Sequence, residues 1–198
     1  MSYSDLQSLK DEVLAKLNDQ DFCARFVEDV DYDEVFYSKG PCFTIIPLEL
    51  EMSGVTPSKI TQKEPSNKKN LSKHYVENGV VVKVESYGSK GLLDEIEIVK
   101  VLEDRLFSLR KNKYNEVLWL KAADLQAGKV LRGCRVDGDL EYWAYRYNWQ
   151  DDKVREAVSF ASNGVAGTEI KVEYGVGSSV SRLFFLANGK EVDVYLNI

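Results

Sequence analysis

The pattern of hydrophobic and polar positions at the start of the chain predicts a helix from Ser4 to about Asp19. Ser4 and Gln7 fit a capping box at its first turn. The apolar side chains that recur at helical spacing on one face are Leu6, Leu9, Val13, Leu14 and Leu17. Either Asp19 or Asp21 can cap a second, shorter helix that carries Phe22 and Phe26. The chain therefore opens with a helix or a pair of helices.

Beyond Tyr75 the pattern changes to short runs rich in Val, Tyr and Phe, which indicates strands. Asn78-Gly79 and Asn188-Gly189 are the residues that two-residue hairpin turns prefer, and Gly138-Asp139 closes another turn. All four prolines lie between residues 41 and 65, so the rest of the chain is free to donate every ladder hydrogen bond. The expected strands are 75–76, 80–86, 115–122, 130–136, 140–149, 168–174, 180–187 and 191–198.

The expected secondary structure of three other segments depends on weaker signals. Alternation of Leu48, Leu50 and Met52 with glutamates predicts a strand over 42–52. A cap at Asp151 or Asp152, followed by Val154, Ala157, Val158 and Ala161, predicts a short helix near 152–162 that stops at Asn163-Gly164. Residues 92–110 fit a helix by spacing, but their β-branched residues favour two strands broken near Glu103-Asp104.

These elements predict an α+β fold, in which the N-terminal helix or helix pair packs on a largely antiparallel sheet. We expect a single domain over 1–198. A subdivision into a helical acidic part, 1–52, and a sheet-rich part, 75–198, stays open as an alternative. A polar, lysine-rich loop over 53–74 would join the two parts.

Charge is distributed very unevenly along the chain. Residues 1–36 hold ten acidic and three basic side chains and sum to −7, whereas the whole protein sums to −6. Such a concentration attracts a cationic partner and repels nucleic acid and anionic membranes. We therefore expect a basic protein partner, with neither nucleic acid nor membrane as a ligand. The carboxylates expected to bind it are those of Glu28, Asp29, Asp31, Asp33 and Glu34.

The residue types that most often bind metals or act as nucleophiles are few and scattered. Cys23, Cys42 and Cys134 show no metal-ligand spacing. His74 is the single histidine and is interpreted as an exposed loop residue. Asp29, Asp31 and Asp33 match the first ligands of a calcium loop, but Glu34 and Gly40 break the pattern. The sequence predicts no cofactor and no metal site, and it leaves enzymatic activity uncertain, with a non-enzyme favoured.

An aromatic stripe is the most distinctive local motif. On a strand, Trp143, Tyr145, Tyr147 and Trp149 share one face. Such a stripe stacks bases or sugars, or anchors a protein partner, but more often it forms the core side of a central strand.

We expect a non-catalytic protein-binding module that uses its acidic N-terminal face, of the kind found in immunity or inhibitor proteins that neutralise a basic toxin or nuclease. One alternative is a metal-dependent hydrolase or nuclease-like enzyme that uses Asp139 or Asp152 with Glu169 and Lys171, an E-x-K motif. Another is a structural or assembly protein that makes contacts through sheet edges and the 59–73 loop. The start of the chain lacks the pattern of a signal peptide, so we expect a cytoplasmic protein of unknown oligomeric state.

Overall fold

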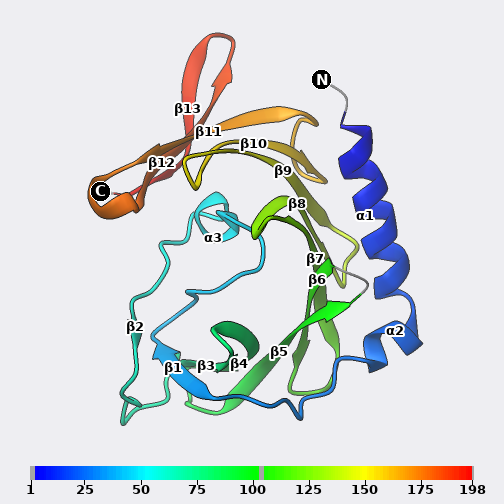
Figure 1. Cartoon of the computed structure of the whole chain (residues 1–198), viewed down its shortest axis with the longest axis vertical. Helices are drawn as coiled ribbons and strands as arrows, with labels where there is room; N and C mark the ends of the chain where they lie inside the picture. The colour runs from blue at the N-terminus through cyan, green and yellow to red at the C-terminus, as the bar shows by residue number, and fades with distance from the viewer. Residues whose placement is uncertain (1–2, 103–104, 198) are drawn as a thin grey trace.

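The fold is a single antiparallel sheet that curls around a covering segment, with helices packed on its outer face (Figure 1). The computed structural model describes residues 3–102 and 105–197. Within these ranges the sheet has 13 strands, and from β3 to β13 each strand pairs with the next one in the chain. Strand β1 pairs with β3 on one side and β2 on the other, so β2 and β13 are the two edges. The result is an α+β fold, as predicted.

The described residues form three α-helices, a 3-10 turn and the 13 strands of the sheet. The α-helices are α1 (Ser4–Leu17), α2 (Gln20–Ala24) and α3 (Glu49–Met52), and a short 3-10 turn spans Val176–Ser178. The first seven strands are β1 (Glu34–Ser38), β2 (Ile60–Thr61), β3 (Ser72–Glu77), β4 (Val80–Tyr87), β5 (Leu93–Leu102), β6 (Arg105–Asn112) and β7 (Val117–Gln126). The others are β8 (Lys129–Asp137), β9 (Tyr142–Gln150), β10 (Lys153–Ala161), β11 (Thr168–Tyr174), β12 (Val180–Ala187) and β13 (Lys190–Leu196).

Hydrophobic side chains cover both faces of the sheet. On the outer face, α1 lies across β7, β8 and β9, and its Leu6, Leu9 and Val13 are buried against the sheet. On the concave face, the segment over 42–52 brings Ile45 and Ile46 into one cluster with buried side chains of β5, β7 and β9 to β13. Burial of apolar surface on both faces therefore holds α1 and the 42–52 segment to the sheet.

Several sequence predictions are confirmed. Helix α1 has nearly the expected bounds, and the carboxylate of Asp19 caps α2 by accepting from the backbone N–H groups of Asp21 and Phe22. Both Asn-Gly turns join adjacent strands, with positive φ at each residue as this turn requires. Residues 92–110 form two strands, β5 and β6, and the expected break at 103–104 lies outside the described residues. The capping box is wrong, because α1 has Tyr3 as its N-cap, with no side-chain cap hydrogen bond.

The helix predicted near 152–162 is wrong, because these residues form β10. Asp151 and Asp152 both have positive φ and make the turn between β9 and β10 rather than a helix cap. The pairing of β10 with β9 skips Arg155, so Val154 and Ala157 point to the same face although they are three residues apart. Because of this β-bulge, Val154 and Ala157 show the three-residue spacing that is also typical of one face of a helix.

The strand predicted over 42–52 is also wrong. This segment crosses the concave face as an irregular chain that ends in α3, with Leu48 in the left-handed region at φ 62°. Adjacent Ile45 and Ile46 are both buried, which a strand covering a sheet with one face does not allow. The expected 53–74 loop contains β2 and the start of β3. Among the described residues no helix is both long enough and apolar enough to cross a membrane.

Candidate functional site: an acidic segment beside a split in the sheet

The acidic residues predicted to bind a partner lie on the connection between α2 and β1, which runs past the ends of β5 and β4 (Figure 1), and Glu34 is the first residue of β1. Glu28, Asp29, Asp31, Asp33 and Glu34 are all exposed. The structure therefore places these five residues on one continuous surface segment, which we call the acidic segment (residues 28–34).

Two of the five carboxylates hold the acidic segment in place. The backbone N–H of Asp33 donates to Val76 O at 2.9 Å, and its carboxylate accepts from the N–H of Asn78 at 2.9 Å. Glu34 accepts from the side-chain amide of Gln62 at 3.1 Å. Within the described ranges, the carboxylates of Glu28, Asp29 and Asp31 make no hydrogen bond or ion pair, so their charges are free to meet a ligand.

A split between β4 and β5 lies beside the acidic segment. The two strands pair from Tyr87 and Leu93 as far as Lys83 and Ile98, and the ladder stops there. On its other side, β4 pairs with β3 through a register shift that skips Val82. An extra residue of this kind bends a strand and increases its twist, so the bulge at Val82 turns the start of β4 away from β5.

The split forms an open slot of about 530 Å³. Its two walls are the β4 residues 80–82 and the β5 residues 99–101, with Leu106 of β6 beside them. Five of these six wall residues are valines. Asp29, Val30 and Asp31 of the acidic segment line the slot, together with Glu77 and Asn78. The slot therefore combines apolar walls with a rim of carboxylates.

The positive charges near the slot are already engaged. Lys100 Nζ donates to Arg25 O at 2.8 Å. Lys83 Nζ donates to Glu28 O at 3.3 Å and lies 3.5 Å from a carboxylate oxygen of Glu85. The side chains of Asp29, Asp31 and Glu77 thus outnumber the one lysine that lines the slot, which gives it a negative field.

The aromatic stripe of β9 lies elsewhere, on the concave face under the 42–52 segment. Tyr145 and Tyr147 are buried, and the hydroxyl of Tyr147 donates to Pro47 O at 2.8 Å. Trp149 Nε1 donates to Val130 O at 2.8 Å, and Trp143 lies beneath the guanidinium of Arg135. The structure brings the four aromatics together but does not bring them to the slot, since none of them lines it. Their arrangement fits the core side of a central strand.

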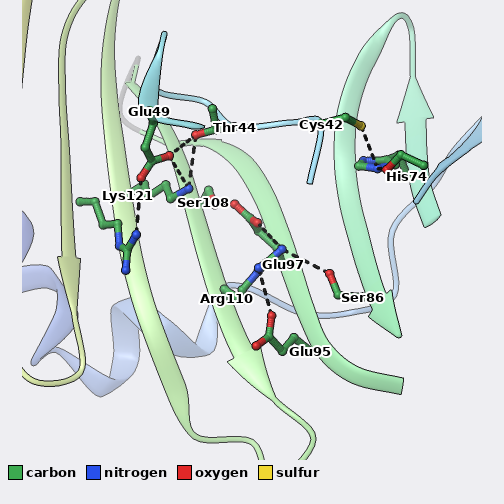
Figure 2. A network of polar contacts seen from close by, with 12 residues as sticks. Cys42, Thr44, Glu49, His74, Ser86, Glu95, Glu97, Ser108, Arg110 and Lys121 are labelled. Atoms are coloured by element: carbon green, nitrogen blue, oxygen red, sulfur yellow. Dashed lines mark hydrogen bonds and ion pairs between the residues drawn. The ribbon is translucent and has the colours of Figure 1, made fainter. Parts of the chain in front are cut away.

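A network of charged side chains crosses the concave face (Figure 2). Lys121 Nζ lies 2.6 Å from Oε2 of Glu49, and the hydroxyl of Thr44 donates to the same carboxylate. The carboxylate of Glu97 accepts from Ser108 and lies 3.2 Å from Arg110. Burial alone would raise the pKa of Glu97, but the charges of Arg110 and Lys121 hold it below its ordinary value. Each of these charges has an opposite partner inside the protein.

His74 is buried on β3, which corrects its interpretation as an exposed loop residue. Its Nε2 lies 3.3 Å from Cys42 Sγ (Figure 2) and 3.1 Å from Ser38 Oγ. The ring of Phe36 stacks on the imidazole. Burial lowers the pKa of His74 to about 4, and burial also raises the pKa of the Cys42 thiol. The imidazole and thiol are therefore both neutral at pH 7, so Cys42 lacks the thiolate that a nucleophilic site uses.

Glu169, Lys171 and Asp152, three residues of the E-x-K alternative, form surface ion pairs. Glu169 and Lys171 lie on β11 as expected for a strand, and Lys171 pairs with Glu156 and with Glu169. Asp152 pairs with Lys129 at 2.7 Å, and Asp139 lies in the turn between β8 and β9. In the part of the chain that the structure describes, no three His, Cys, Asp or Glu side chains are grouped to hold a metal ion.

Comparison of the sequence with protein-family models and with curated proteins finds no match. The functional assignment therefore rests on the chemistry of the chain itself. The slot was missed by the sequence analysis, although the run of three valines at 80–82 breaks the alternation of β4 and marks the position of the bulge.

Proposed function

We propose that this chain is a non-catalytic protein-binding module whose acidic segment and adjoining slot bind a basic protein partner. The observation that carries the proposal is the position of Asp29 and Asp31. Their carboxylates are exposed and have no partner among the described residues, and both line a slot with valine walls.

The two parts of the surface have different roles in binding. The five exposed carboxylates of the acidic segment steer a cationic protein towards this end of the molecule and raise the association rate. The valines of the slot supply apolar area, which holds a bound side chain by excluding water. An inhibitor or immunity-type protein that neutralises a basic toxin or nuclease would use this combination.

The experiment measures binding to the basic proteins encoded by neighbouring genes, by calorimetry at low and at high salt. The test variant is Glu28→Gln, Asp29→Asn and Asp31→Asn together. The matched control, Glu169→Gln, Glu173→Gln and Glu191→Gln, removes the same charge from exposed positions on β11 and β13.

We expect the test variant to lose at least about tenfold in affinity at low salt and the control to bind nearly as the parent does. Salt should weaken the parent complex more than the complex of the test variant. Equal affinities for the parent and the test variant would overturn the proposal, as would the absence of a basic protein among the neighbouring gene products.

A further inference from the structure

In the part of the chain that the structure describes, the slot leaves the facing backbone edges of β4 and β5 without a ladder partner. Strand β4 pairs with β3 along residues 80 and 81, and β5 pairs with β6 along 99–102. Where the two strands face each other across the slot, the ladder between them ends at Lys83 and Ile98. Val80–Val82 and Val99–Val101 therefore present inner strand edges, which act as a template for another strand.

We propose that the slot binds an extended segment of the basic partner by strand addition, with the main chain of the segment hydrogen-bonded to the edge of β4, of β5 or of both. This inference rests on the proposed function and specifies how the same site holds its partner. In strand addition, main-chain hydrogen bonds provide affinity, and the pockets for alternate side chains provide specificity.

The two faces of the slot differ in chemistry, and this difference predicts the sequence of the segment. Val81 and Val99 belong to hydrophobic clusters of the concave face, which also include Phe36 and Tyr145. Asp29 and Asp31 line the slot from the segment that joins α2, on the outer face, to β1. Because successive side chains of a strand point to opposite faces, the bound segment should alternate apolar residues with lysine or arginine.

The length of the slot limits the segment to a few residues. On the slot side, three residues of each wall have no ladder partner among the described residues, so the contact spans about 10 Å at the rise of a strand. A short basic and apolar stretch within a loop or terminus of the partner would satisfy this requirement.

The test uses a fluorescent peptide of about seven alternating valine and lysine residues with both ends capped. Its affinity is compared with that of two peptides of the same sequence, each N-methylated at alternate residues. N-methylation removes the hydrogen-bond donor and keeps both charge and side chains, so a merely electrostatic contact is left unchanged. A peptide with glutamate in place of lysine is the charge control.

We expect the unmethylated peptide to bind and at least one of the two methylated peptides to lose about tenfold or more in affinity. Equal binding of all three valine–lysine peptides, with a loss in the Asp29→Asn, Asp31→Asn variant, would overturn strand addition and leave the proposed function standing. Loss on methylation without any effect of the two aspartates would support strand addition and contradict the role of charge. Absence of binding by the unmethylated peptide would overturn strand addition, while the neighbouring-gene experiment still tests the proposed function.

Discussion

Lys121 and Glu49 form an ion pair that joins the covering segment to the sheet: Nζ lies 2.6 Å from Oε2, and the two side chains are 6% and 7% exposed. Glu49 opens α3 and Lys121 lies in the middle of β7, so the pair links residues far apart in the sequence. Thr44 donates to the same carboxylate and also accepts from Lys121 Nζ at 3.3 Å. These bonds fix the position of the 42–52 segment on the concave face.

Breaking this pair should destabilise the protein strongly. Lys121→Met leaves the carboxylate of Glu49 buried without its main counter-ion, and we expect the free energy of unfolding to fall by about 3–5 kcal/mol. The double variant Glu49→Leu, Lys121→Met should lose less than the sum of the two single variants, because no buried charge is left unpaired. Urea unfolding measures the free energy of unfolding of the parent, of the two single variants and of the double variant. Asp94→Asn, which breaks the exposed pair with Lys113, is the control and should leave the midpoint nearly unchanged.

The burial of His74 predicts a dependence of stability on pH. In the folded protein its pKa is about 4, below the ordinary value of 6.5, because burial opposes the charged form. Between these values the unfolded chain binds more protons than the folded one, so stability falls as the pH drops from about 6.5 to about 4, by about 3 kcal/mol in total. Urea unfolding at several pH values measures this slope. His74→Phe should remove most of it above pH 4.5, and an identical slope in both proteins would show that other groups cause it.

Leu140 gives a test of backbone strain. It has φ 66° in the turn between β8 and β9, a region that costs an L-residue energy and glycine little. Since its side chain is 57% exposed, Leu140→Gly should raise the free energy of unfolding by about 0.5–1 kcal/mol. Leu186, which is 59% exposed in β12, is the control: Leu186→Gly should lower the stability, because glycine weakens a strand. A loss of stability in both variants would contradict the role assigned to strain.

Deletion of Val82 should close the slot. Removal of the extra residue leaves every other residue of β4 on its present face and allows the strand to continue its pairing with β5. We expect the deletion variant to fold, to lose affinity for the valine–lysine peptide by tenfold or more, on the order of one lost anchor, and to keep its acidic segment. Circular dichroism checks the fold and fluorescence anisotropy checks binding. A folded deletion variant that binds as the parent does would show that the slot is not the site.

How far the sequence predicts this structure depends on whether a signal is local. The helices α1 and α2 and the two Asn-Gly hairpins were predictable because spacing, caps and turn residues act over a few positions. Strand β10 was not predictable from local signals, since a bulge at Arg155 places Val154 and Ala157 at helical spacing on one face of a strand. The conformation of the 42–52 segment was not predictable either, because the ion pair of Glu49 with Lys121, which are far apart in the sequence, overrides the alternating pattern of the segment. The acidic residues stay a prediction made from charge alone, whereas the slot beside them depends on the bulge at Val82.

We predict that a basic extended segment binds in the slot beside Asp29 and Asp31. Amide hydrogen exchange, followed residue by residue with and without the valine–lysine peptide, tests it most directly, because it reports where backbone groups gain partners. We predict that the peptide slows exchange within Val80–Val82 or Val99–Val101 and that Asp29→Asn with Asp31→Asn weakens this protection. Protection confined to other strands, or none at saturating peptide, would contradict the claim.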